Sequence, residues 1–353
     1  MTATDKPAPA AIRKARDDNP KMRERELAAQ LGISEAEFVA AWVGEGTRRI
    51  EPRANDFLAG MEALGEVMAL TRNESAVHEK IGVYDKVVAG DHAAMALGEQ
   101  IDLRIFPKVW ASGFAVAKTD GEGNVRRSLQ FFDASGEAVH KVHLRDASNV
   151  DAYEALVVTL MSDDQSPTVA VKPVAASNQN NGPVTAHPDD LRERWSKMTD
   201  VHQFVSILRD MKLTRQQAVK LVGGDYAWPV DVDAVPAMMR HAAAEKMPIM
   251  CFVGSRGCIQ IHSGPIETIK PMGPWINVID PTFHLHLRVD HIHEAWVVRK
   301  PSADGHVTSL EAYDADGRLI IQFFGKRNEG SAEREDWRFL AENLPRLPQS
   351  TAA

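Results

Sequence analysis

The sequence predicts an α+β fold in which a domain with a large, mostly antiparallel β-sheet flanked by helices occurs twice, through an internal duplication. The first observation is a repeat, because SLQFFDASG at 128–136 aligns closely with SLEAYDADG at 309–317. The second is the order of patterns in each half, where helical spacing comes first and alternating apolar residues follow. Runs of helices followed by runs of strands are typical of α+β domains with antiparallel sheets.

A segment with the composition of an exposed linker separates the two copies. Residues 162–190 are rich in Ser, Asn, Gln, Pro and Gly, which favour turns and flexible connections over packed elements. We therefore predict a first repeat over residues 1–165, a linker over 166–188 and a second repeat over 189–347. The length of 353 residues suits two domains of average size.

Helix signals open the first repeat. The first twenty residues are charged and lack the apolar segment of a secretory signal, so we predict a frayed tail there. Asn19 and Pro20 then form a cap and a first-turn proline for a helix that Gly32 ends. Ser34 and Glu37 have the spacing of a capping box, which predicts another helix directly after it.

The second repeat opens in the same way. Apolar residues recur at helical spacing from residue 191, and their stripe includes a histidine. The stripe consists of Leu191, Trp195, Met198, His202 and Val205. Thr214 and Gln217 form a further capping box, and the helix that follows it ends at Gly223.

Alternating runs follow each helical block and predict strands. They cover 66–70, 100–106 and 113–118 in the first repeat and 249–253, 282–289 and 296–299 in the second. A glycine-containing turn comes after the last run of each set, at 120–123 and at 303–305. Each repeat is therefore predicted to contain a hairpin at this point.

Composition and charge exclude several classes of protein. The formal net charge is −8, so no overall positive field attracts nucleic acid or an anionic membrane, and we expect neither partner. The longest apolar runs fall far short of the ~18 residues needed to cross a bilayer. Cys251 and Cys258 are too few for a disulfide framework, and we interpret them as packed thiols beside a strand turn. We expect a cytoplasmic protein.

Cations stand beside aromatic residues at several places in the predicted strands. Arg104 and Phe106 alternate within one strand, so their side chains should lie on one face. A similar mixture occurs around Lys300 and in QFFGKR at 322–327. A flat apolar ligand with acidic groups needs such a surface, with a ring to lie on and cations for its carboxylates. The alternative for Arg104 and Phe106 is a structural stacking pair.

His202 shares its helical stripe with apolar residues, so we expect its imidazole to face an apolar surface. One interpretation is a metal ligand, because histidine is the commonest one. The alternative is a core histidine bonded to the backbone. A helix break at Thr199 or Asp200 would place His202 in a first turn, where the helix dipole favours the neutral, ligating form.

Two histidine pairs, His284 with His286 and His291 with His293, have the alternation that puts each pair on one strand face. This geometry suits zinc, but no known zinc spacing supplies the remaining ligands. We therefore interpret these histidines as polar residues on the faces of antiparallel strands. A zinc hydrolase is the third function considered, after two others. The sequence has no signature of a nucleotide, dinucleotide or common hydrolase site.

Four segments carry a family resemblance. They are LRIFPKVW at 103–110, TDVHQF at 199–204, LTRQQA at 213–218 and QFFGKR at 322–327. Together and in this order they resemble the HemS/ChuS/PhuS (HmuS) family of cytoplasmic haem-handling proteins, also called hemin-degrading factors. The resemblance extends from residue 19 to about residue 347 and includes the internal duplication.

The resemblance implies a haem b (hemin) group held between the C-terminal sheet and the helical layer. It implies His202 as the axial ligand of the haem iron, with Arg104 facing the iron on the distal side and Phe106 beside it. The same match implies further site residues, namely the propionate or rim cations Arg215, Lys300 and Arg327 and the pocket-lining Phe252, Gln322 and Phe324. Phe324 departs from the family, because close relatives carry a tyrosine there.

The resemblance implies two functions of different class. In the first, the protein belongs to a haem-uptake system, sequesters haem received from the cytoplasmic side of an importer and delivers it to a haem oxygenase. In the second, it is an enzyme that cleaves the porphyrin ring and releases iron, with Arg104 polarising the distal oxygen ligand. We favour the first, because a single neutral histidine ligand permits release and the sequence has no reductase or flavin motif.

Overall fold

The computed structural model describes residues 6–172, 184–327 and 330–348, and in it the chain divides into two compact units. The first unit holds the described residues 6–72, 79–172 and 254–260, and the second holds 73–78, 184–253 and 261–348. The predicted linker over 166–188 includes residues 173–183, which lie outside the described residues. The predicted domain boundaries therefore stay a prediction.

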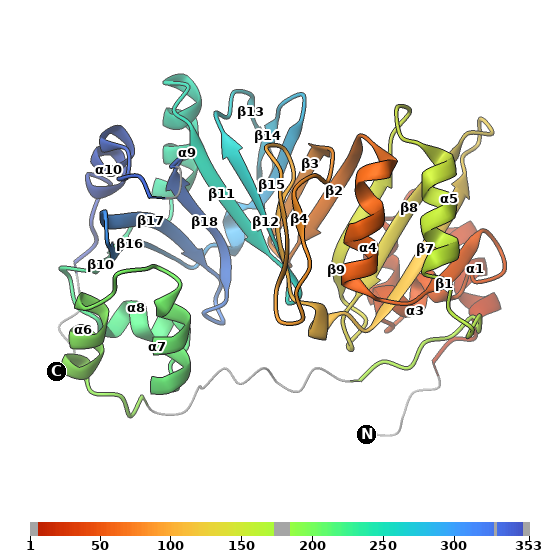
Figure 1. Cartoon of the computed structure of the whole chain (residues 1–353), viewed down its shortest axis with the longest axis horizontal. Coiled ribbons are helices and arrows are strands. Elements are labelled where there is room, and N and C mark those ends of the chain that lie inside the picture. The colour runs from red at the N-terminus through yellow and green to blue at the C-terminus, as the bar shows by residue number, and fades with distance from the viewer. Residues whose placement is uncertain (1–5, 173–183, 328–329, 349–353) are drawn as a thin grey trace. The chain divides into compact units, whose positions relative to one another are not determined.

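The first unit is built on an antiparallel sheet in the order β1-β7-β8-β9-β2 (Figure 1). Its strands are β1 (Thr47–Ile50), β2 (Val67–Arg72), β7 (Ser112–Thr119), β8 (Val125–Phe132) and β9 (Ala138–Leu144). A smaller antiparallel set comprises β4 (Val87–Val88), β5 (Ala94–Leu97) and β6 (Asp102–Ile105). Strand β3 (Ala76–Gly82) contributes residues to both units.

Helices cover both faces of this sheet. On one face α4 (Ala54–Met61) and α5 (Val150–Thr159) bring Phe57 and Leu156 into a core with Leu129. The other face belongs to α1 (Pro9–Asp18), α2 (Glu24–Gln30) and α3 (Glu35–Ala40), and there Val39 clusters with Phe114. Because successive strand residues point to opposite faces, one sheet carries both apolar layers. Short 3-10 turns, η1 (Glu62–Leu64) and η2 (Pro107–Val109), complete the unit.

The second unit repeats this order of elements. Its antiparallel sheet runs β10-β16-β17-β18-β11. The strands are β10 (Ala227–Val230), β11 (Ile249–Gly254), β16 (Glu294–Ser302), β17 (Gly305–Tyr313) and β18 (Leu319–Gly325). The smaller set comprises β13 (Ile269–Met272), β14 (Trp275–Ile279) and β15 (Phe283–Arg288), followed by η3 (Val289–His291). Strand β12 (Cys258–Gly264) contributes residues to both units.

Two helical layers cover the second sheet as well. α9 (Ala234–Ala244) and α10 (Glu335–Glu342) bring Met238 and Trp337 into a core with Leu310. α6 (Pro188–Ser196), α7 (Gln203–Met211) and α8 (Arg215–Leu221) gather into one group (Figure 1), whose Trp195 and Phe204 cluster with β16 and β17 side chains. This second group of helices covers the face of the sheet that carries the candidate site.

The structure confirms the predicted α+β fold and its internal duplication. Both capping boxes are present, Ser34 with Glu37 and Thr214 with Gln217. The predicted strand runs fall in β2, β6 and β7 and in β11, β15 and β16. The cysteines are buried free thiols on β11 and β12, as predicted. Among the residues described, no helix is long and apolar enough to cross a membrane.

The predicted frayed tail is wrong over part of its length. Pro9 occupies the first turn of α1, and this helix buries Ile12. The next helix starts at Glu24 and not directly after Pro20, which lies in a turn. A buried apolar side chain at one point of a mostly polar segment is enough to dock such a helix, because packing outweighs weak intrinsic propensity.

The apolar stripe predicted from residue 191 does not form one continuous helix, and the helix break considered near Thr199 and Asp200 is present. α6 ends at Ser196 and α7 begins only at Gln203. In between, the side chain of Gln203 accepts hydrogen bonds from the backbone N–H groups of Thr199 (2.9 Å) and Asp200 (3.3 Å). These donors are satisfied by a side chain and not by a preceding helical turn, so the helix is interrupted and the apolar stripe loses its phase.

Candidate ligand-binding site

One face of the second sheet, the face covered by α6, α7 and α8, carries most of the predicted site residues. On β17, Leu310 and Ala312 contribute to the core with α9 and α10, so Glu311 and Tyr313 point to the other side. The same alternation places four predicted site residues on this side, namely Phe252 of β11, Lys300 of β16, and Gln322 and Phe324 of β18. Arg215 reaches this face from the first turn of α8.

The carboxylate of Glu311, which is fully buried, is the centre of this face. It accepts hydrogen bonds from the ammonium of Lys300 (2.9 Å), the hydroxyl of Ser309 (2.9 Å) and the amide of Gln322 (2.8 Å). The hydroxyl of Tyr313 donates a fourth hydrogen bond at 2.5 Å. Because buried charges are costly unless they are paired and hydrogen-bonded, these donors account for the presence of a carboxylate inside the unit.

Arg215 is the outermost member of this cluster. Its Nη1 lies 3.2 and 3.4 Å from the two carboxylate oxygens of Glu311, the longest of the polar contacts that Glu311 makes. Its side chain is 26% exposed, whereas that of Lys300 is 6% exposed. Two cations around one carboxylate leave a net positive charge, and Arg215 is the cation through which that charge reaches solvent.

Protonation follows from the same geometry. Burial alone would raise the pKa of Glu311, but the charges of Lys300 and Arg215 and the hydrogen bonds hold it well below its usual range. Burial lowers the pKa of Lys300, and the carboxylate of Glu311 opposes that effect. Glu311 is therefore ionised throughout the physiological range, and it is the counter-ion of the buried ammonium.

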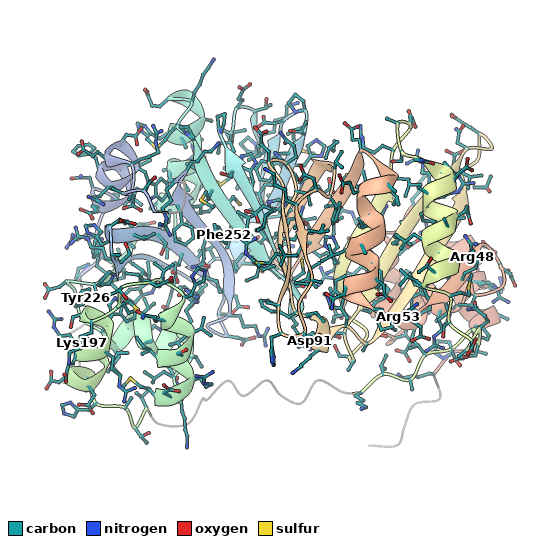
Figure 2. All side chains as sticks on the ribbon, viewed as in Figure 1. Arg48, Arg53, Asp91, Lys197, Tyr226 and Phe252 are labelled. Carbon is teal, nitrogen blue, oxygen red and sulfur yellow. The ribbon has the colours of Figure 1, made fainter. Side chains whose placement is uncertain are left out.

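Aromatic rings lie beside the cations. Arg215 and Lys300 both stand over the ring of Phe204, each with its charged group 4.9 Å from the ring centroid. Phe252 and Phe324 meet edge to face at a centroid distance of 4.9 Å, and both are half-buried. Phe252 is labelled on β11 in Figure 2. This face thus offers apolar ring surface next to positive charge, the combination that the sequence predicted.

His202 occupies the N-cap position of α7, immediately after the helix break. Its side chain is 88% exposed, so the prediction that its imidazole faces an apolar surface is wrong. Asp200 accepts hydrogen bonds from both the backbone N–H of His202 (2.7 Å) and its ring Nδ1 (2.8 Å). These two hydrogen bonds come first among the causes that lower the pKa of Asp200, and the charge of Arg327 contributes as well.

The pairing with Asp200 decides which ring nitrogen of His202 can act. With Nδ1–H donated to a carboxylate, the lone pair of the neutral ring lies on Nε2, which faces away from that bond. A carboxylate behind a histidine fixes its tautomer and raises its basicity toward a metal. His202 is therefore arranged as an accessible metal ligand whose orienting carboxylate is already in place.

Arg104 and Phe106 belong to the first unit. Arg104 lies on β6 and pairs with Asp102, whose pKa is raised by burial and lowered in part by this arginine. Phe106 lies one residue beyond the end of β6, and its backbone N–H donates to the carbonyl of Gly257 at 2.9 Å. The alternation used to place both side chains on one face ends at Ile105. Their joint contribution to a site stays a prediction.

The histidine pairs on β15 and η3 do not support the zinc alternative. The side chain of His286 meets Asn277 at 2.6 Å, and that of His291 meets Ser75 at 2.9 Å. In the described part of the chain no group of three histidine, cysteine or carboxylate side chains could hold a metal ion. His284 and His286 lie on a strand, as the preferred interpretation has it, whereas His291 lies in η3 and His293 just beyond it, so for the second pair the predicted strand face is wrong.

Three residues of this region were missed by reasoning from the sequence, namely Asp200, Phe204 and Glu311. Asp200 sits two residues before the candidate ligand, a spacing typical of a local side-chain cap. Glu311 has a stronger signal, because it replaces the neutral Gln130 at the matching position of the repeat, between the apolar Leu310 and Ala312. A carboxylate introduced into a buried strand implies cations around it.

Comparison with known proteins agrees with this picture. A family model described as the haemin-degrading HemS.ChuX domain matches residues 32–160 and again residues 212–344. The hemin transport protein HemS of Yersinia enterocolitica is 42% identical over 325 residues, which cover 92% of this chain and 93% of that protein.

Solved structures resemble the whole chain as well. Holo-PhuS, a heme-binding protein from Pseudomonas aeruginosa, matches with a TM-score of 0.89 and 41% identity, covering 96% of this chain and 98% of its own. ChuS, described as an E. coli heme oxygenase, matches with a TM-score of 0.83 and 38% identity, covering 92% of this chain and 96% of its own. The match extends over both units in each case.

Proposed function

The chain belongs to the family of haemin-degrading HemS/ChuX domains, and from this premise we propose that it binds haem through its second unit and delivers it to a haem oxygenase. The proposal places the protein on the cytoplasmic side of a haem importer, where it would receive the imported haem. The relatives support haem handling in general, because they are described as hemin transport, heme-binding and heme oxygenase proteins.

The observation that carries the proposal is the exposure and hydrogen bonding of the His202 imidazole. Its ring is exposed at the start of α7, its Nδ1 is bonded to Asp200 at 2.8 Å, and its Nε2 is directed away from that bond. This is the arrangement expected of an axial ligand, because a neutral imidazole with an oriented tautomer binds iron through its other nitrogen. Bound haem would supply the iron centre, and His202 would hold it.

The rest of the face fits the other parts of haem. Arg215, backed by Lys300, offers a cation for a propionate, and Arg327 adds charge close to the start of α7. Phe252 and Phe324 offer ring edges and faces to an apolar macrocycle. The donors and rings therefore fit a flat ligand with carboxylates on one edge. Arg104 and Phe106 are proposed as the distal pair, on the family resemblance alone.

Transfer is favoured over ring cleavage because the chain provides one neutral histidine for the iron, which permits release, and its sequence has no reductase or flavin motif. Ring cleavage is the second candidate, and one observation favours it, since a structure 38% identical to this chain is described as a heme oxygenase. In that case Arg104 would act on the distal oxygen ligand with electrons from an external reductant.

A hemin titration tests the proposed binding. We expect a saturable shift of the Soret band at one haem per chain, which His202→Ala abolishes or strongly alters because the axial nitrogen is lost. His187→Ala is the matched control, because His187 is also an exposed N-cap histidine with a neighbouring aspartate, at the start of α6. A spectrum unchanged in His202→Ala would contradict the assignment of the axial ligand.

A second experiment separates transfer from cleavage. The haem-loaded protein is mixed with an apo haem oxygenase, or given an electron donor in the presence of catalase. Spectral transfer of intact haem to the oxygenase is expected. A bilin of one defined isomer, formed by the protein alone while catalase removes peroxide, would favour the degrading enzyme over the carrier.

A further inference from the structure

We propose that Glu311 is an internal counter-ion of Arg215 that a carboxylate of the ligand replaces, so that the second unit releases its ligand faster than it would without Glu311. The inference rests on the proposed function, because it concerns how a carboxylate-bearing ligand is held and released there. It assigns a role in release to a buried residue that has no direct access to solvent.

The first argument is that Arg215 can leave Glu311 at small cost. Its contacts to the carboxylate, at 3.2 and 3.4 Å, are longer than those of Lys300, Ser309 and Gln322, at 2.8–2.9 Å. After Arg215 turns away, the carboxylate still accepts those hydrogen bonds and stays paired with the ammonium. Breaking a buried ion pair is costly when it leaves one buried charge without a partner. Here no buried charge is left in that state.

The second argument is access. The side chain of Arg215 is 26% exposed, and those of Lys300 and Glu311 are 6% and 0% exposed. The ion pair to Glu311 uses Nη1, so Nη2 and Nε lie outside it. A guanidinium can bind a carboxylate with two parallel hydrogen bonds, and a ligand carboxylate that takes this geometry competes directly with Glu311.

The third argument comes from the first unit, where charge is distributed differently over the matching positions and the position of Arg215 holds a carboxylate. Glu35 occupies the first turn of α3, as Arg215 does in α8, and Lys141 and Gln130 stand where Gln322 and Glu311 stand. Glu35 is paired with Arg72 and Lys141, whose side chains are 10% and 11% exposed. Both cations of the first cluster are thus nearly covered, whereas Arg215 is loosely held and partly exposed.

Competition has a predictable sign. A ligand carboxylate bound to Arg215 is repelled by the negative charge of Glu311, which lies a short distance behind the guanidinium. This repulsion raises the free energy of the protein with its ligand bound. Replacing Glu311 by glutamine removes the repulsion and the competitor and keeps a side chain of the same shape. Dissociation should become slower by about tenfold, on the scale of measured effects for close charge pairs.

The experiment measures the dissociation rate of hemin into an excess of haem-scavenging apoprotein. Glu311→Gln is expected to slow release about tenfold. Glu35→Gln removes a similarly buried carboxylate from the first unit and is expected to leave the rate unchanged. The decisive probe is hemin dimethyl ester, whose carboxylates are blocked. The wild-type protein and Glu311→Gln should release the ester at the same rate.

A further comparison keeps the inference testable if the first variant fails to fold. If Glu311→Gln does not fold, the same comparison is made between Lys300→Met and the double variant Lys300→Met, Glu311→Gln, in which the buried carboxylate and ammonium are removed together. An equal or faster release of hemin from the variant without Glu311, or an equal slowing with the ester, would overturn the inference. A wild-type protein that shows no saturable hemin binding would instead overturn the proposed function.

Discussion

Glu35 in the first unit and Glu311 in the second are both buried carboxylates between two cations, yet they arise from different parts of one scaffold. In the first unit the carboxylate is on a helix and the cations are on strands. In the second unit the carboxylate is on a strand, and one cation is on the helix that corresponds to α3. The capping boxes and strand registers that hold these residues are the same in both units.

A duplicated domain can carry a single site when matching positions of its two copies differ in charge. The strands and helices tolerate exchange of charge between positions as long as each buried carboxylate keeps its donors, because it is a buried charge left without a partner that is strongly destabilising. In the first unit the exchange leaves its two cations almost covered, and in the second it leaves Arg215 partly exposed. Binding chemistry can therefore differ between units whose folds agree.

The largest expected effect comes from removing either carboxylate outright. Glu311→Ala leaves Lys300 and Arg215 without their counter-ion and should lower the free energy of unfolding of the second unit by about 3–5 kcal/mol. Glu35→Ala should have an effect of the same order on the first unit. Urea unfolding followed by hydrogen exchange assigns each loss to its unit. A loss of stability in both units from either variant would contradict the assignment of one carboxylate to each unit.

The next effect is the dependence of stability on acid. Burial raises the pKa of Glu35, but Lys141 and Arg72 outweigh it and bring the pKa to about 2 from an ordinary value of 4.5. A carboxyl with a lowered pKa stabilises the fold above its ordinary pKa, and this contribution is lost as the pH falls toward the folded value. The first unit should thus lose about 3 kcal/mol between pH 4.5 and pH 2.

Glu35→Gln is the variant that tests this acid dependence. It should flatten the loss of stability of the first unit over that range and leave the second unit unchanged, because Glu311 and the cations around it are not altered. Unfolding measured at several values of pH provides the comparison. The role given to Glu35 would be contradicted if the first unit had the same acid profile in the wild-type protein and in the variant.

A smaller effect, on hemin affinity, is expected from a change of Asp200, which pairs with His202 in the second unit. Asp200→Asn keeps the size of the side chain and removes the carboxylate that orients His202. We expect hemin affinity to fall by roughly tenfold, the lower end of the range known for carboxylates that orient a ligating histidine. Asp189→Asn, beside His187 at the start of α6, is the control and should leave the affinity unchanged.

The smallest effect is expected at Phe324, where His143 stands in the first unit. Phe324→Tyr adds the hydroxyl that the family resemblance implies at this position, on a ring that is half-buried beside Phe252. One added hydrogen bond contributes about 1 kcal/mol or less in such a place, so hemin affinity should rise by about threefold. A Soret titration measures the change, and a fall in affinity would indicate that the ring edge is packed too tightly for the hydroxyl.

Much of the fold could be predicted because its repeated parts carry local signals. The hairpin sequences at 128–136 and 309–317 and the two capping boxes are short-range patterns that the structure reproduces. Helices α4, α5, α9 and α10 were not predicted. The second half of α5 lies in an apolar run without a clear helical period, and α9 starts without a side-chain cap, so packing against the sheet contributes much to both.

The candidate site could be predicted only in part. The cations and rings were visible in motifs, and Lys300, Arg215 and Gln322 do meet around one carboxylate. That carboxylate, Glu311, was missed because its partners come from several elements separated in the chain. The helix break near Thr199 and Asp200 was considered and is present, but the exposure of His202 was predicted wrongly, because spacing alone does not reveal how the residues after the break are oriented.

The two thiols give the protein a chemical tolerance suited to its proposed cargo. Cys251 and Cys258 are both buried, and burial raises the pKa of each, that of Cys258 to about 12. Oxidants attack the thiolate form, which these side chains do not reach at neutral pH. Peroxide generated near redox-active iron would therefore meet no thiolate on this chain at neutral pH, so the cysteines would stay reduced while haem is bound.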